Sequence, residues 1–183
     1  MSVKYTYKLS DTLLEVLDDL TEGRDPEMVT VEGLTKFTLP DIEAGTEELS
    51  GYSGLMGTLE LVDWASANAM ELALTIVGVP DNANVLLSPK KREIKISWAE
   101  KYATKAGDVG WDNYSVYAKG LLKTFPGGDG EKGNKYEREL KFSLLTYKYS
   151  KNGEAVFDYD PANDTISFYG VNHADDIKKA VLG

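Results

Sequence analysis

The chain has 183 residues, of which 42% are hydrophobic and 27% charged, so it is long enough to bury a core and too apolar to be disordered throughout. It contains no cysteine, which excludes disulfide bonds, thiolate catalysis and zinc sites built on cysteine. Its formal net charge of −10 disfavours binding to nucleic acids and anionic membranes. Solubility is the ordinary use of such an excess, and the sharper interpretation is a surface that something negatively charged must pass without adhering.

The length predicts one domain over residues 1–183. The first residues have no apolar signal core, and no apolar run approaches membrane-spanning length, so we expect synthesis in the cytoplasm.

The N-terminal region, residues 1–27, is expected to form an arm and a helix. Residues 3–9 alternate between apolar and polar side chains, which predicts a short strand. Over residues 12–22 the apolar residues fall at helical spacing: Leu13, Val16, Leu17 and Leu20. Because Thr12 and Glu15 also fit a capping box, we predict a helix here, with a strand as the alternative.

The next segment predicts a strand over Met28–Leu39 that ends at Pro40, which cannot donate to a ladder. Residues 41–57 then form a long connection, rich in glycine and serine. Loops of this length are usually functional or disordered, so the alternatives are a mobile surface loop and a binding arm. The apolar anchors of such an arm are Leu49, Tyr52, Leu55 and Met56.

The middle of the chain predicts four more strands, at residues 58–62, 69–77, 91–101 and 114–125. Asp63 to Ser66 forms a turn, and Asp81 caps a short helix through Leu87. On the third of these strands we expect Ile94, Ile96 and Trp98 to point inward. The glycine-rich residues 106–110 and 126–134 are expected to be loops.

The last quarter of the chain has the clearest pattern. Tyr136–Tyr149 is a long alternating run with Leu140, Phe142 and Leu144 on one face, as in a half-buried strand. Asn152-Gly153 predicts a type I′ hairpin turn, because both residues tolerate positive φ. Strands follow at residues 154–160 and 165–169, and Asn172 is predicted to cap a terminal helix. Many short strands separated by turns favour a mainly antiparallel β-sandwich or barrel with short flanking helices.

No catalytic, metal or cofactor site can be assembled from the sequence. His173 is the only histidine, and it has no identifiable nucleophile partner. The glycine-rich run 127–133 lacks the Gly-Lys-Ser/Thr ending of a phosphate loop. Asp158, Asp160 and Asp164 lack the glycine and the glutamate of a calcium loop. We therefore predict that the protein is not an enzyme.

Three segments carry a family resemblance: Gly33–Glu43, Leu144–Glu154, and Asp164–Gly183 with its Val171-Asn172-His173-Ala174-Asp175 stretch. In this order, they resemble the major tail tube protein of contractile bacteriophage tails and phage-derived bacteriocins. The resemblance covers about residues 28–183. It departs from the family in the acidic residues 12–22 and at His173, where glycine is expected.

The resemblance implies a structural protein of a virion tail or phage-tail-like particle, whose six copies close into a ring and whose rings stack into a hollow tube. The implied partners are other copies of the chain, the tail sheath protein, baseplate, initiator and terminator proteins, and DNA that passes without specific binding. The predicted strands at 58–62, 69–77, 91–101 and 114–125 are candidates for the channel wall, and the 41–57 loop for contacts between rings. The candidate channel acids are Glu60, Glu71 and Glu100.

Two alternative functions stay open at this point. One is a tube subunit of type VI secretion, which shares the implied fold. The other is a β-sandwich module that binds carbohydrate, with Trp64, Trp98 and Trp111 as the aromatic platform.

Overall fold

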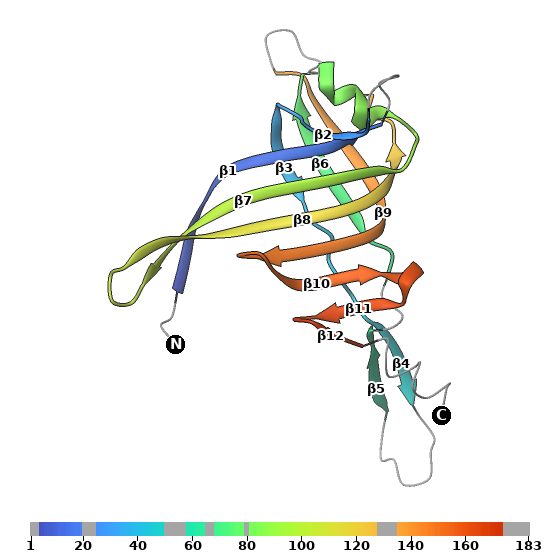
Figure 1. Cartoon of the computed structure of the whole chain (residues 1–183). Coiled ribbons are helices and arrows are strands. Elements are labelled where there is room, and N and C mark those ends of the chain that lie inside the picture. Colours follow the sequence, from blue (N-terminus) through green and yellow to red (C-terminus); the bar gives the residue numbers. More distant parts are fainter. Residues whose placement is uncertain are drawn as a thin grey trace.

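The computed structural model describes residues 4–19, 25–49, 58–64, 68–78, 81–127 and 135–173. Figure 1 shows a mainly antiparallel β architecture with one short helical segment at its upper end. The strands are β1 (Lys4–Asp18), β2 (Glu27–Thr30), β3 (Leu34–Thr38), β4 (Gly45–Leu49), β5 (Leu59–Asp63), β6 (Glu71–Val77), β7 (Arg92–Thr104), β8 (Val109–Thr124), β9 (Glu137–Lys151), β10 (Glu154–Asp160), β11 (Thr165–Phe168) and β12 (Val171–Asn172). The 3₁₀ helices are η2 (Asp81–Leu87) and η3 (Pro161–Asn163).

Ten strands form one sheet whose main path runs β12-β11-β10-β9-β8-β7-β1-β2. The sheet forks at β9, because residues 137–143 pair with β6 and residues 147–151 pair with β10. β6 pairs in turn with β3. Since β2 pairs with β1 and β3 follows directly in the chain, the segment 27–38 links the β2 end of this path to β6, which pairs with β9, and the sheet curls over its own core.

The helix predicted over residues 12–22 is wrong for its described part, because residues 12–18 belong to β1. Burial there alternates as in a strand: Leu14 and Val16 are buried, whereas Leu13, directly before Leu14, is 42% exposed. β7 pairs with β1 from Lys4 to Val16 and satisfies the backbone groups along one edge of β1. The helical spacing of the leucines was outweighed by this pairing, which is available only once the chain has folded. Residues 20–22 lie outside the described residues.

The single strand predicted over Met28–Leu39 is divided into β2 and β3 by Gly33. Its φ of +85° lies in the left-handed region, and its carbonyl accepts a hydrogen bond from the Val77 amide at 2.8 Å. A Cβ at this position would lie 2.7 Å from the Val77 carbonyl oxygen. Glycine at position 33 therefore allows the chain to turn from β2, which pairs with β1, into β3, which pairs with β6.

A pair of glycine substitutions tests this assignment. Gly153 has nearly the same φ, +83°, but a Cβ there meets nothing within 4 Å. We expect Gly153→Ala to lower the free energy of unfolding by about 1 kcal/mol through backbone strain alone. Gly33→Ala adds a backbone clash and should cost at least about twice as much. Denaturant unfolding measures both free energies of unfolding. Equal losses in the two variants would show that the backbone shifts away from the Cβ at position 33 without a loss of stability.

The core lies between the two halves of the curled sheet and follows the predicted alternation. Leu140, Phe142 and Leu144 of β9 are buried, as are Ile94, Ile96 and Trp98 of β7, so these predictions are confirmed. Leu72, Leu74 and Ile76 of β6 complete one cluster with Leu14, Val16, Val116 and Leu86. Phe37 of β3 lies 5.0 Å from Trp98, which itself stacks on Tyr114 at 5.6 Å. The aromatic contacts thus join β3 to β7 and β8 across the core.

The connection predicted over residues 41–57 is partly wrong, because residues 45–49 form β4. β4 pairs antiparallel with β5 from Gly45↔Asp63 to Leu49↔Leu59. This two-stranded hairpin stands away from the main sheet at the lower end of the molecule (Figure 1). Residues 50–57 of the predicted connection lie outside the described residues.

The strands and the turn predicted for the last quarter are confirmed, whereas the predicted helix cap at Asn172 is wrong. Asn152 and Gly153 have φ of +51° and +83°, as a type I′ turn requires, and join β9 to β10. Asn172 lies in β12, where its side-chain oxygen accepts a hydrogen bond from the Ile166 amide at 3.0 Å. The predicted terminal helix lies outside the described residues.

Candidate assembly surfaces

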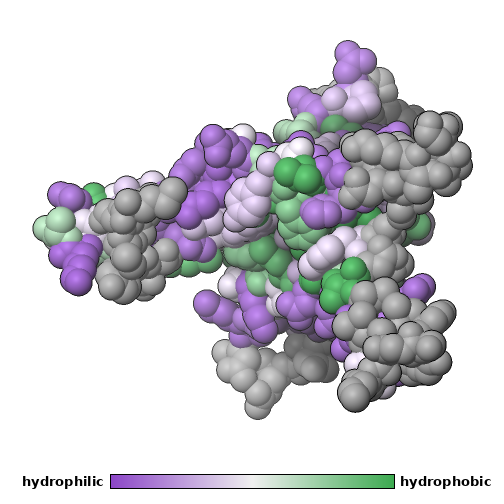
Figure 2. Space-filling view, turned by 90° about the horizontal axis from the view of Figure 1, so that it is seen from below, coloured by the Kyte–Doolittle hydropathy of each residue, from purple (hydrophilic) through white to green (hydrophobic). Residues whose placement is uncertain are grey.

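A three-stranded arm extends beyond the core on one side of the molecule. It consists of the first part of β1, the end of β7 and the start of β8, paired from Lys4↔Thr104 and Ala103↔Val109 inward. Figure 1 shows the three strands crossing where the arm leaves the body, and Figure 2 shows the arm standing clear of it. The arm therefore lacks the second layer that covers the rest of the sheet.

Both edges of the arm are unpaired within the described part of the chain. β8 pairs with β9 only from Tyr114 onward, and β1 pairs with β2 only from Glu15 onward. Trp111 and Val109, which share one face of the arm, are 53% and 57% exposed. Unpaired strand edges next to exposed apolar side chains are the usual features of a surface that binds another protein chain.

Contacts between residues of the arm itself fix its tip and the approach of β7 to β8. At the tip, Thr104 accepts and donates hydrogen bonds with Asp108, and Gly107 between them takes a φ of +92°. Lower down, Tyr102 lies across Gly110, where a Cβ would come within 2.5 Å of the tyrosine oxygen. Lys101 covers Trp111 at 5.8 Å from the ring centroid. The hairpin is thus ordered by its own residues up to the turn.

A buried polar cluster fixes the arm at its root. Asp112 is 3% exposed and receives the Lys151 ammonium at 3.1 Å and the Asn152 amide at 3.1 Å. The Asn152 oxygen in turn accepts a hydrogen bond from the Asn113 amide at 2.8 Å. Hydrogen bonds to Tyr114 and then to Asp112 raise the pKa of Lys151, so its charge is stabilised. The β9–β10 turn therefore holds β8 at the point where the arm begins.

The outer face of the main sheet carries a row of directly opposed residues across five strands. The row is Glu15, Lys95, Tyr117, Lys148 and Asp158, contributed by β1, β7, β8, β9 and β10. Lys95 lies 2.6 Å from Glu15, and Lys148 lies 3.0 Å from Asp158. The ammonium groups of Lys95 and Lys148 are therefore each held by a carboxylate on the neighbouring strand.

A second group lies beside this row. Glu93 of β7 accepts the Lys119 ammonium at 2.8 Å and a short hydrogen bond from the Tyr117 hydroxyl. The bonds from Lys119 and then Tyr117 lower the pKa of Glu93. Burial, and then the bond to Glu93, raise the pKa of Tyr117 to about 12. Lys119 and Lys148, together with Lys91, line a shallow hollow of about 370 Å³ on this face.

The three candidate channel acids do not share one surface. Glu71 of β6 lies on an outward face, 2.7 Å from Lys123 and 3.8 Å from Lys141, and the Lys123 hydrogen bond lowers its pKa. Glu100 of β7 follows the inward-facing series of Ile96 and Trp98, and accepts a hydrogen bond from the Trp98 indole at 3.0 Å. Glu60 is exposed on β5 of the separate hairpin.

The predicted anchors of the 41–57 segment lie mostly outside the described residues: only the backbone of Leu49, in β4, is described, and Tyr52, Leu55 and Met56 are not. On the hairpin itself Glu47, Glu48 and Glu60 are exposed, and Glu48 lies directly opposite Glu60. Residues 41–63 include six acidic residues and no lysine or arginine. The hairpin therefore carries a concentrated negative charge.

The three tryptophans do not form a carbohydrate platform. Trp98 is 4% exposed in the core, and Trp64 packs edge-on against Phe168 at 4.7 Å. Only Trp111 is exposed, on the arm. Trp111 was not predicted as a surface residue of a strand, because residues 106–110 were expected to form a loop and the strand was expected to begin at Tyr114. β8 begins at Val109. The alternation of Val109, Trp111 and Asn113 against Gly110 and Asp112 was the available signal.

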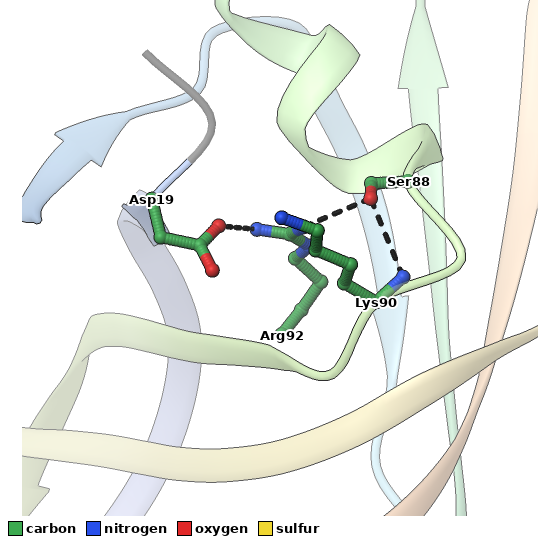
Figure 3. A network of polar contacts seen from close by, with 4 residues as sticks. All are labelled: Asp19, Ser88, Lys90 and Arg92. Carbon is green, nitrogen blue, oxygen red and sulfur yellow. Dashed lines mark hydrogen bonds and ion pairs between the residues drawn. The ribbon is translucent and has the colours of Figure 1, made fainter. Parts of the chain in front are cut away.

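A buried arginine ties the upper end of the sheet together (Figure 3). Arg92 is 1% exposed, and one end of its guanidinium forms an ion pair with Asp19, which follows β1. The other end donates to the Ser88 hydroxyl at 2.8 Å, and the Lys90 amide donates to the same oxygen at 3.3 Å. The bond to Arg92 lowers the pKa of Asp19 below its ordinary value of 3.8. This cluster connects β1, the η2 helix and β7.

Among the described residues there is no group of three or more histidine, aspartate or glutamate side chains arranged to hold a metal ion. No helix in the described ranges is long and apolar enough to span a membrane.

Comparison with known proteins places the chain in a family. A sequence model of the family described as phage tail tube protein FII matches residues 29–183. The chain belongs to this family. The match confirms the predicted resemblance, which was expected to cover about residues 28–183. As a tail tube protein, the chain has a structural role in a phage tail or a tail-like particle, and the family is not enzymatic.

Comparison with solved structures gives a weaker likeness. A chain of the anti-feeding prophage baseplate, from a six-fold symmetrised cryo-EM structure, is 10% identical to this tail tube protein. The similarity covers 78% of this chain and 93% of the other, with a TM-score of 0.44. A search of curated proteins found no significant match.

Proposed function

We propose that this tail tube protein closes into hexameric rings, and that the rings stack into the hollow inner tube of a contractile injection apparatus. The tube conducts DNA or pierces the target envelope. The observation that carries the proposal is the arm, whose unpaired edges and exposed Trp111 lie outside the subunit's own core. The family membership and the six-subunit organisation implied by the sequence resemblance support the same function.

The arm is proposed to close the ring. The arm's exposed face and edges occupy one side of the subunit, and its contact on a second copy is proposed to be a different surface. Such a head-to-tail contact closes into a ring when the rotation between copies allows it. Pairing along the arm's edges would extend the sheet from one subunit to the next and remove the edges from solvent.

The β4–β5 hairpin is proposed to join successive rings, with Leu49, Tyr52, Leu55 and Met56 as the contact residues. An isolated two-stranded hairpin is marginally stable in water, and the opposed Glu48 and Glu60 destabilise it further. Contact with another copy would compensate for both costs. Stacking of this kind continues without limit, and it makes rods rather than single rings.

The outer face of β1, β7, β8, β9 and β10 is proposed to line the channel. Its polar side chains extend across five neighbouring strands, and three of its lysines are paired with carboxylates. Of the candidate acids, Glu71 lies nearest to such a face, whereas Glu60 and Glu100 lie elsewhere. The tail sheath and the baseplate, initiator and terminator proteins are the further partners that a tube of this type requires.

Negative-stain electron microscopy of the purified protein, over a concentration series, tests the proposal. We expect hollow rods or six-fold rings that become more abundant as the concentration rises. If the protein forms only uniform small particles, addition of preformed tail or baseplate fragments should start rods. Small particles at every concentration, with and without such fragments, would contradict the proposal.

A further inference from the structure

The outer face of the sheet combines two features that are at odds with each other. It displays lysines in the regular spacing of a sheet, which suits contacts with a phosphate backbone. Each of these lysines is also bound to a carboxylate: Lys95 to Glu15, Lys119 to Glu93 and Lys148 to Asp158, at 2.6 to 3.0 Å. Three positive and three negative charges therefore cancel on a face of a protein whose total charge is −10.

The pairs are expected to contribute little to stability. The lysine side chains are 42%, 34% and 47% exposed and their carboxylate partners 20%, 24% and 28%, and pairs of this kind typically contribute about 1 kcal/mol or less each. A solvent-exposed face needs no lysines at all to remain soluble in a protein this acidic. The repeated pairing across strands therefore calls for an explanation other than stability.

We infer that this face is a latent polyanion-binding surface, and that its own carboxylates keep it from binding. Glu15, Glu93 and Asp158 occupy the ammonium groups that would otherwise bind phosphates. Removing these three carboxylates would free the ammonium groups of Lys95, Lys119 and Lys148. Lys119 and Lys148 line a shallow hollow together with Lys91. The biological role rests on the proposed function, since DNA meets this face only if it lines the channel.

A channel wall of paired charges would affect DNA differently from a purely acidic wall. An acidic wall repels DNA over a long range and raises the cost of entry, whereas a neutral wall of paired charges neither repels nor holds the phosphates. Glu93 stays ionised at neutral pH because the bonds from Lys119 and Tyr117 lower its pKa. The carboxylates thus compete with DNA for the lysines throughout the physiological pH range.

The inference is tested by removing the carboxylates in the full-length protein. The variant is Glu15→Gln, Glu93→Gln and Asp158→Asn together, and the probe is a short fluorescein-labelled DNA duplex of mixed sequence. Fluorescence anisotropy at low salt, below the concentration of rod formation, should show at least tenfold tighter binding than for the native protein. If the three lysines each contact a phosphate, log K should fall with log salt at a slope of about −2.7.

A charge-matched variant separates this effect from net charge. Glu27, Glu139 and Glu154 are exposed and form no ion pair among the described residues, and their replacement by glutamine changes the net charge equally. This control should bind DNA no better than the native protein. Adding Lys95→Gln, Lys119→Gln and Lys148→Gln to the first variant should abolish its binding.

Two outcomes would overturn the inference: equal DNA binding by the charge-matched variant, or no binding by the variant without its carboxylates. The readout is independent of polymerisation. Failure to form rods would contradict the proposed tube and leave the binding result intact.

Discussion

Replacing Trp111 by glutamate is expected to prevent rod assembly without unfolding the protein. The side chain is 53% exposed on an arm without a covering layer, so the monomer loses little when it is replaced. In the ring, an exposed tryptophan on the contact surface is the kind of residue that contributes about 2 kcal/mol or more to binding. Because 1.4 kcal/mol is a tenfold change, the concentration needed for rods should rise on the order of 30-fold. Electron microscopy of a concentration series measures this.

Two comparisons make the result specific to the arm contact. Trp111→Tyr keeps an aromatic side chain of similar shape and should retain assembly. The thermal midpoint of Trp111→Glu should equal that of the native protein, which shows that the fold is intact. Rods of Trp111→Glu at the native concentration would exclude the arm face as a ring contact.

Replacing Asp19 by alanine is expected to give a large loss of stability. It leaves the Arg92 guanidinium, which is 1% exposed, without its carboxylate, and the Nε atom of this arginine already has no hydrogen-bond partner. Breaking a buried ion pair by removing one partner costs about 3 to 5 kcal/mol, and the low end applies because Asp19 itself is 35% exposed. Denaturant unfolding at neutral pH gives the value.

A double variant distinguishes a stranded charge from lost packing. Asp19→Ala with Arg92→Met removes both charges and should recover most of the loss, because an apolar side chain of similar length is well accommodated there. Glu15→Ala, which removes one partner of a more exposed pair, should cost less than about 1 kcal/mol. If Asp19→Ala costs no more than Glu15→Ala, the buried pair does not hold the upper end of the sheet together.

The Asp19 pair also sets an acid limit on stability. Its pKa is lowered in the folded protein, so its contribution is complete above the ordinary pKa of 3.8 and is lost as the pH falls through the folded value. Below about pH 4 the native protein should therefore lose stability more steeply than Asp19→Ala.

The strands of the last two thirds were predictable because each has a local pattern that agrees with its burial. Around Phe142 the side chains alternate between buried and more exposed, and Asn152 and Gly153 have the positive φ angles that a two-residue type I′ turn requires. β1 was not predictable in the same way. Its leucines fit a helix and a strand almost equally, and the decision came from pairing with β7, which lies some 80 positions further along the chain. Local sequence carries no record of such a partner.

The candidate surfaces were less predictable than the fold. The acids proposed from the sequence were chosen without knowledge of their faces, and the structure separates Glu60 and Glu100 from Glu71. The pairing of Lys148 with Asp158 or Lys119 with Glu93 depends on strand register across β7 to β10. Register is set by the folded sheet, so no spacing in the sequence identifies these pairs.

A cryo-EM reconstruction of the assembled protein tests the proposed tube directly. We predict six subunits in each ring, the arm of one subunit packed against the next, and the Lys95, Lys119 and Lys148 face turned towards the channel. A reconstruction in which the arm extends into solvent, or in which this face lies on the outside of the tube, would contradict it.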